Sequence, residues 1–284
     1  MPRMFNRIRR PAETGFTIVE LLIGITVLTV LMPVVLLTLS DLLRSATGAL
    51  GLNVQDTDTK SVLRSINLEL AGVYTWNTSL AVATPLGPTN NTSTPETWSY
   101  CGINGTSDCS VSTNRVLIAY QNATNKAPTD TTRQPVFANT AGSCDTSQPI
   151  NIVHYANIYF VAPDTTDPSY NDLYRRTVVN PDGYTVCGGV VPYQTNTCAR
   201  SVLSNAGCKD ASNVSHADAI LLTHVISFNV DYYPTPNGTA IANPYTALPG
   251  SITSAQAIKI SVTTQALING SLRSNTADVR INSY

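Results

Sequence analysis

The sequence predicts an α+β fold in which one long N-terminal helix packs on a mostly antiparallel β-sheet. An uncharged, mostly apolar run covers residues 21–40, and apolar residues then recur at helical spacing as far as Val73. Short β-branched and aromatic runs, separated by polar connections, follow in the second half of the chain. The 284 residues suffice for one large or two small domains beyond the apolar run.

The apolar run has the length of a membrane-spanning helix. At about 1.5 Å per residue, twenty helical residues cross the roughly 30 Å hydrocarbon core of a bilayer. Counted from the first apolar residue, Phe16, the span includes Glu20 close to its start, where an unpaired charge costs on the order of 2.5 kcal/mol. Glu20 is therefore either a functional carboxylate with a cationic partner or a group at the membrane edge that reaches the lipid headgroups.

The residues before Glu20 resemble a known processing signal. A short basic leader, residues 1–15, ends in Gly15; Phe16 follows, and Glu20 is the fifth residue after that glycine. This pattern resembles the type IV prepilin signal, which a membrane-embedded prepilin peptidase cleaves after the glycine, usually with methylation of the new N-terminus. The resemblance implies cleavage between Gly15 and Phe16. It also implies that Glu20 pairs with the Phe16 amine of its own or a neighbouring subunit, and such a cation makes a buried carboxylate tolerable.

The charges of the leader predict the topology. It contains four arginines and one glutamate, so the positive-inside tendency keeps it in the cytoplasm and places the bulk of the chain outside. An ordinary secretory signal peptide is the competing interpretation, but it has a shorter apolar core and ends at an Ala-x-Ala-like site, which is missing here. We expect a leader at 1–15, a long helix at 16–72 with its transmembrane half at 16–40, and an extracytoplasmic β-rich domain at 73–284.

Three residues are expected to weaken the long helix. Pro33 lies inside the span, where proline removes one backbone hydrogen bond and can kink a helix. Gly48 and Gly51 each cost about 1 kcal/mol relative to alanine in a helix interior. Beyond them, one apolar face requires a cover, so the second half of the helix is expected to pack on the domain.

The rest of the chain is expected to form strands and loops. Residues 75–114 are rich in Thr, Asn, Ser, Pro and Gly, which predicts a loop. The strand-like runs are residues 116–120, 150–161, 173–179, 184–191, 220–233 and 257–267.

Several of these segments resemble minor pilins and pseudopilins of the PilW and PulJ type. Residues 63–74 resemble the end of their first helix. Residues 157–161 and 172–176 resemble their central hairpin, whose return strand often reads Leu-Tyr-Arg-Arg. Residues 225–232 resemble their Val-x-Ser-Phe-x-Val-x-Tyr strand, and residues 257–262 the strand after it. This resemblance implies a type IV pilin-like fold.

The cysteines indicate disulfide bonds. All six lie beyond the apolar run, and an even number of cysteines outside the membrane is typical of disulfides, with fifteen connectivities open. Cys101 and Cys109 could close a small loop, and a second local bridge could form within the group Cys187, Cys198 and Cys208. The chain has no Cys-x-x-Cys pair, so we expect no metal. The six candidates are Cys101, Cys109, Cys144, Cys187, Cys198 and Cys208.

Other classes of function find little support in the sequence. The formal net charge of −1 and the low charged fraction of 12% argue against nucleic acid as a partner. Neither a metalloprotease histidine pair nor a Gly-x-Ser-x-Gly motif occurs, so we expect no enzyme and no cofactor. Asp164, Asp167 and Asp172 lack the ligand spacing of a calcium loop, which favours a solvated turn over a calcium site.

Four aromatic residues flank the polar loop, and two interpretations of them are open. Exposed aromatics could stack on sugars or anchor a partner, but we favour a cover for the helix end and the sheet edge. The residues are Tyr74, Trp76, Trp98 and Tyr100.

The family resemblance implies a function in assembly. It indicates a minor, low-copy subunit of a type IV pilus, or fimbrium, that initiates assembly or sits at the filament tip. The implied partners are the prepilin peptidase, other pilins, an inner-membrane assembly platform and the lipid bilayer. The subunit would be a single-pass membrane protein before assembly and part of a cell-surface pilus afterwards. The alternatives are a type II secretion pseudopilin J-like subunit and a pilus-associated surface adhesin that binds through residues 75–149.

Overall fold

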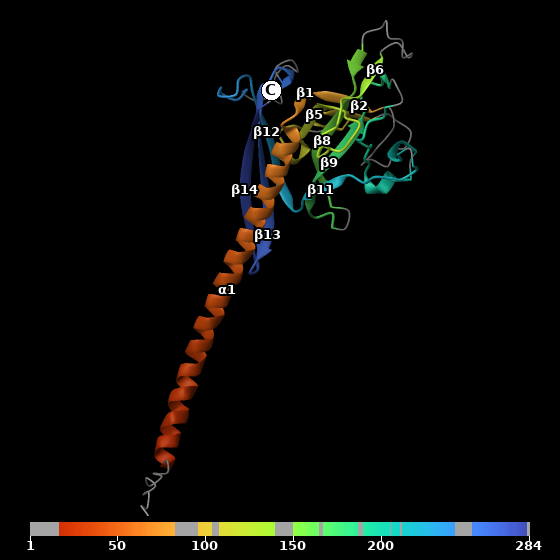
Figure 1. The fold of residues 1–284 in the computed structure, drawn as a ribbon. Coiled ribbons are helices and arrows are strands. Elements are labelled where there is room, and N and C mark those ends of the chain that lie inside the picture. The colour runs from red at the N-terminus through yellow and green to blue at the C-terminus, as the bar shows by residue number, and fades with distance from the viewer. Residues whose placement is uncertain are drawn as a thin grey trace, which may run out of the picture. The chain divides into compact units, whose positions relative to one another are not determined.

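The computed structural model describes residues 17–82, 96–103, 108–139, 150–164, 167–186, 190–204, 206–210, 212–241 and 252–282. Figure 1 shows the elements along the chain. The helices are α1 (Ile18–Leu70), η1 (Ser112–Asn114), η2 (Arg200–Val202) and η3 (Ala206–Cys208), the last three being short 3₁₀ turns. The strands are β1 (Val73–Asn77), β2 (Ser79–Val82), β3 (Glu96–Ser99), β4 (Gly102–Ile103), β5 (Val116–Asn122), β6 (Phe137–Asn139), β7 (Ile150–Ile152), β8 (His154–Pro163), β9 (Asn171–Val179), β10 (Thr185–Val186), β11 (Ala219–Leu222), β12 (Val225–Tyr233), β13 (Ala257–Ile268) and β14 (Ser271–Asn282).

Helix α1 is a single helix of 53 residues, which corresponds to about 80 Å at 1.5 Å per residue. The predicted long helix is therefore confirmed over the described residues. Pro33, Gly48 and Gly51, where weakening was expected, do not interrupt it. The chain divides into two units between Gly51 and Leu52. The second unit thus contains the last part of α1 as well as the sheets, whereas the sequence placed the start of the domain at residue 73.

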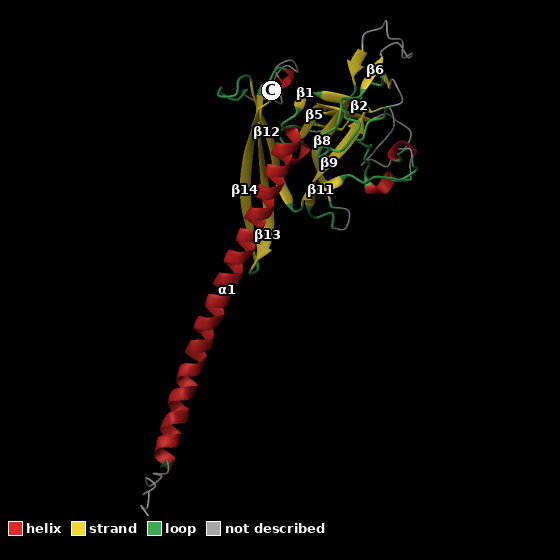
Figure 2. Cartoon of the chain, viewed as in Figure 1, coloured by secondary structure: helices red, strands yellow, loops and turns green. Residues whose placement is uncertain are grey.

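The largest sheet has the strand order β1-β5-β8-β9-β11 and is antiparallel throughout. Its centre is the β8–β9 hairpin, in which Phe160 lies opposite Tyr174 and Asn157 lies opposite Thr177. The hairpin, predicted from alternating residues and the polar connection between them, is confirmed. The prediction of one strand over residues 150–161 is wrong in part, because the chain divides at Val153 into β7, which pairs with β6 in another sheet, and β8. Figure 2 shows the strands of this sheet beside the last part of α1.

A second antiparallel sheet has the order β12-β13-β14. Its β13–β14 hairpin turns at Asn269 and Gly270, whose φ angles of 52° and 76° are the left-handed values that Asn-Gly adopts in tight turns. The prediction of one strand over residues 220–233 is wrong. The chain breaks at His224, which has a φ of 57°, so β11 belongs to the five-stranded sheet and β12 to this one.

The prediction of a loop over residues 75–114 is also wrong in part. Strands β2, β3 and β4 pair there into a small antiparallel sheet, with Leu80 opposite Trp98. The burial of Trp98 explains this, because its side chain is 1% exposed and anchors an otherwise polar segment to the core. Where a strand was expected at residues 184–191, the structure describes only β10, which pairs with β6.

The core forms where the last part of α1 meets both large sheets. Leu63, Ile66 and Leu70 lie on one face of the helix and are at most 2% exposed. Burial of each such side chain stabilises the fold by about 1.5–3 kcal/mol. Their neighbours in this core include Leu117, Tyr159 and Leu173 from the five-stranded sheet, and Phe228, Ile258 and Val262 from the β12-β13-β14 sheet.

Polar contacts fix the end of α1 to the five-stranded sheet. The Arg175 guanidinium in β9 donates to both carboxylate oxygens of Glu69, at 2.7 and 2.8 Å. Asn157 Nδ2 in β8 donates to Glu69 Oε1 at 2.9 Å, and Gln121 Nε2 in β5 donates to the Glu69 carbonyl at 2.9 Å. Three strands therefore hold one residue in the last turn of the helix.

A second core lies on the opposite face of the five-stranded sheet. Strand residues alternate between the two cores, so Leu117 faces α1 whereas Ile118 faces away. In the same way Arg175 faces Glu69, and its neighbour Arg176 faces the second core, where it binds Asp218. The second core also contains Trp98, Phe160, Tyr174, Val178, Cys198 and Cys208.

Candidate functional site

The first turn of α1 is closed by reciprocal hydrogen bonds between Thr17 and Glu20. The Thr17 N–H and hydroxyl each donate to Glu20 Oε2 at 3.0 Å, and the Glu20 N–H donates to Thr17 Oγ1 at 3.3 Å. The Thr17 carbonyl accepts the first helical hydrogen bond from Leu21, so Thr17 is the N-cap. This arrangement is a capping box. It provides partners for N–H groups that a lipid environment could not satisfy.

The apolar segment satisfies its other polar groups internally. Each hydroxyl within residues 21–40 donates to a backbone carbonyl three or four residues earlier, which removes the penalty of an unpaired polar group in lipid. The closest of these bonds run from Thr26 to Ile23 at 2.8 Å, Thr29 to Thr26 at 2.9 Å, Thr38 to Val35 at 2.9 Å and Ser40 to Leu37 at 2.8 Å.

The side chains of this segment are apolar on every side of the helix. From Ile18 to Leu43, every large apolar side chain is at least 50% exposed. By length and composition α1 is the one helix among the described residues that could cross a membrane. Exposed apolar surface of this extent requires a cover, which a bilayer or other apolar helices would supply.

The predicted processing residues, Gly15 and Phe16, lie outside the described residues. The pairing of Glu20 with the Phe16 amine therefore stays a prediction. The structure adds a second role for Glu20, because its Oε2 oxygen caps the helix. Sequence reasoning missed this role although the signal was present, since Thr-x-x-Glu directly before an apolar run is the pattern of a capping box.

Two of the disulfides left open by the sequence are formed. Cys101 bonds to Cys109, with 5.1 Å between their Cα atoms, and Cys198 bonds to Cys208, with 5.7 Å between theirs. The second bond is fully buried in the core that faces away from α1. Cys144 and Cys187 lie outside the described residues.

The aromatic residues that flank the polar segment are mostly structural. Trp76 and Trp98 are each 1% exposed, which confirms the expectation that they cover the helix end and the sheet. Tyr74 differs, being 66% exposed, and it stacks on the His154 ring with 5.1 Å between the ring centroids. His154 in turn contacts Asp182, with 2.9 Å between Nδ1 and Oδ2.

The acidic connection between β8 and β9 forms a turn. Asp167 Oδ1 accepts hydrogen bonds from the Ser169 N–H and hydroxyl, which is the geometry of a solvated Asx turn. Asp172 is 1% exposed and accepts the His224 N–H at 3.2 Å, and burial raises the pKa of its carboxyl group. The described residues contain no group of three or more histidine, cysteine or acidic side chains able to hold a metal ion.

We compared the chain with protein-family models, with curated proteins and with solved structures, and found no match in any of the three comparisons.

Proposed function

We propose that this protein is a minor subunit of a type IV pilus, which a bilayer holds by the first part of α1 before a filament takes it up. The function rests on the prepilin-like signal at residues 1–20 and on the PilW-like and PulJ-like segments described above. The chemistry of the described residues supports it.

The observation that carries the proposal is the change of character along α1. In the first unit the helix presents apolar side chains in all directions, whereas Leu63, Ile66 and Leu70 are buried in the core of the second unit. A helix that only stabilised a globular domain would not need an uncharged, fully exposed apolar extension. A subunit stored in lipid and then packed among other helices does need one, because both environments cover apolar surface on every side.

The capping box is compatible with an assembly role for Glu20. Oε2 accepts both hydrogen bonds from Thr17, and Oε1 accepts none from any described residue. An ionised carboxylate has about four lone-pair sites, so the cap leaves Glu20 able to receive an ammonium group. On this proposal one oxygen orders the helix start, and the other attracts the N-terminal amine of a processed subunit.

Two variants separate these roles. Glu20→Gln removes the charge but keeps an N3 residue able to form the capping box, whereas Thr17→Ala removes the cap and keeps the charge. We expect both proteins to insert into the membrane, and we expect Glu20→Gln alone to lose most of its incorporation into sheared filaments. Asp41→Asn is the matched control, since it removes a carboxylate from the other end of the apolar run. Normal incorporation of Glu20→Gln would refute the role of the charge.

Mass spectrometry of the native N-terminus tests the processing step. The proposal requires a chain that begins at a methylated Phe16, and a Gly15→Val variant should keep its leader. A native chain that retains residues 1–15, or that begins at an internal small residue, would refute it. Recovery of the subunit in sheared surface pili, rather than in a periplasmic secretion filament, distinguishes a pilin from a type II secretion pseudopilin.

A further inference from the structure

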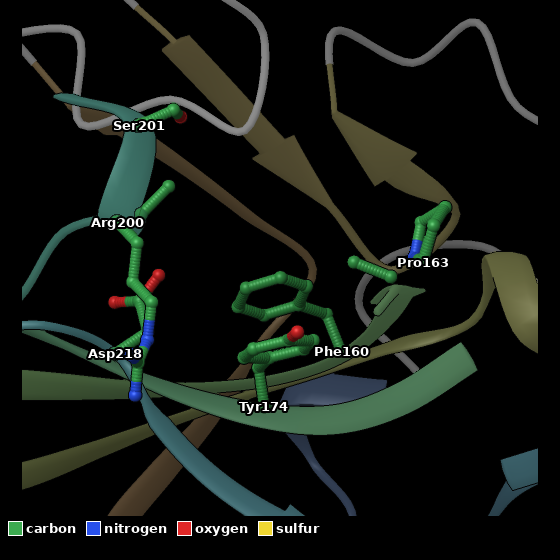
Figure 3. A pocket seen from close by; sticks show the side chains of 8 residues that line it. Phe160, Pro163, Tyr174, Arg200, Ser201 and Asp218 are labelled. Carbon is green, nitrogen blue, oxygen red and sulfur yellow. The ribbon is translucent and has the colours of Figure 1, made fainter. Parts of the chain in front are cut away.

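A cavity of about 260 Å³ lies on the second core, away from α1, between the β8–β9 hairpin and the segment that contains η2. Figure 3 shows its lining, with Phe160 and Tyr174 from the hairpin on one side and Arg200 and Ser201 from η2 on the other. Ala162, Pro163, Ala199 and Asp218 complete the lining.

The walls of this cavity are fixed by strong local bonds. The buried Arg176 guanidinium binds the Asp218 carboxylate, with 2.6 Å between Nη2 and Oδ2, and the Thr197 hydroxyl donates to Asp218 Oδ1 at 2.9 Å. The Cys198–Cys208 disulfide closes the segment that carries η2. Because both sides are held in this way, the cavity is a preformed space rather than a gap that side chains could easily fill.

The side chains that line the cavity are mostly apolar, and two of them are aromatic rings. Phe160 and Tyr174 stack with 5.6 Å between their ring centroids, beside Pro163. The Tyr174 hydroxyl is buried and has no hydrogen-bond partner among the described residues. The hydroxyl therefore does not open onto the cavity, and Tyr174 contributes its ring to the lining.

The charges of the residues that line the cavity favour an anion. Asp218 is neutralised by Arg176, so its carboxylate does not repel a negative ligand as a free one would. Arg200 is exposed and forms no ion pair with any described residue. Arg200 therefore supplies one cation beside an apolar space, and it calls for a negatively charged acceptor.

We propose that this cavity binds a small aromatic carboxylate, whose ring lies among Phe160, Tyr174 and Pro163 and whose carboxylate accepts hydrogen bonds from Arg200. The volume fits, since a cavity of about 150 Å³ already holds a benzene ring and the remainder accommodates the acid group. Stacking of aromatic rings adds to the affinity beyond the burial of area.

The test uses the full chain in detergent micelles, with benzoate as the probe and benzyl alcohol as an uncharged match, each titrated by calorimetry. Benzoate has nine non-hydrogen atoms, so ordinary ligand efficiency predicts a dissociation constant between about 0.1 and 10 mM. We expect Arg200→Gln to weaken benzoate binding about tenfold, the loss of one charge-assisted hydrogen bond, and to leave benzyl alcohol binding unchanged.

Two further variants change the lining of the same cavity. Tyr174→Phe keeps the ring and removes a hydroxyl that does not open onto the cavity, so it is the matched control and should leave benzoate binding unchanged. Ala199→Leu fills the cavity and should abolish binding. The proposal is overturned if benzoate does not bind at about 10 mM, if Ala199→Leu binds it as well as the unmodified chain does, or if benzyl alcohol binds as tightly as benzoate.

Discussion

Replacement of Arg176 by methionine is expected to destabilise the globular unit by about 3–5 kcal/mol, the usual loss when one partner of a buried ion pair is removed. The Arg176 side chain is 0% exposed and that of Asp218 is 4% exposed. Nε and Nη2 donate to the carboxylate at distances from 2.6 to 3.2 Å. Methionine fills much of the same volume as arginine but leaves the Asp218 carboxylate without its cation. Of the described polar contacts of Asp218, only the hydrogen bond from the Thr197 hydroxyl is kept.

Arg175→Met is the matched control, because it changes the same residue type at the next position of the same strand. Its ion pair is more hydrated, with side-chain exposures of 32% for Arg175 and 24% for Glu69. Glu69 would also keep its hydrogen bond from Asn157. We therefore expect a smaller loss, of about 1–2 kcal/mol.

Urea unfolding of the purified chain in detergent, followed by tryptophan fluorescence, measures both variants. The chain has two tryptophans, Trp76 in the core beneath α1 and Trp98 in the opposite core, so the signal reports on both sides of the sheet. Equal losses of stability in Arg176→Met and Arg175→Met would refute the greater cost assigned to breaking the buried ion pair. The double variant Arg176→Met/Asp218→Leu should recover most of the loss, because it removes the orphaned carboxylate together with the cation.

Two other predictions concern the helix and the β8–β9 connection. Leu63→Ala should lower the free energy of unfolding by about 2–5 kcal/mol. Leu68→Ala, at a position 71% exposed on the same helix, should change it by less than about 0.5 kcal/mol. Equal losses in urea titrations would contradict the assignment of the buried face of α1. Burial raises the folded pKa of Asp172 above its unfolded value of about 3.9, so the unfolding free energy contributed by this group falls as the pH rises above about 4. Asp172→Asn keeps an acceptor for the His224 N–H and should be more stable than the unmodified chain at pH 7 but not at pH 3; urea midpoints that differ equally at the two pH values would exclude this explanation.

The sequence was most informative where one short-range pattern dominates. Uninterrupted hydropathy followed by a single apolar stripe was enough to predict α1, and clear alternation was enough for the β8–β9 hairpin. Strand β14 was missed because its residues are mostly polar and exposed, and it is a strand by virtue of its pairing with β13. The break at His224 was missed because a change of sheet leaves the hydrophobic pattern on both sides intact.

The chemistry of the sites was predicted less well, for two physical reasons. Buried arginines are rare, so nothing local distinguishes Arg176 from a surface residue, and its partner Asp218 is 42 positions away. The cavity beside it depends on the same long-range closure. By contrast the capping box of Thr17 and Glu20 lies within four residues, and a search for local motifs could have found it.

The two adjacent arginines of β9 also help to fix the register of this strand in the sheet. A slip of one residue would exchange the faces on which the guanidinium groups emerge and separate each from its acid. A slip of two would keep the faces but displace both groups by about 7 Å along the strand, beyond the reach of their carboxylates. Any other register of the β8–β9 hairpin would therefore lose an ion pair on each face of the sheet. The two ion pairs thus favour a single register for the sheet on which the last part of α1 packs.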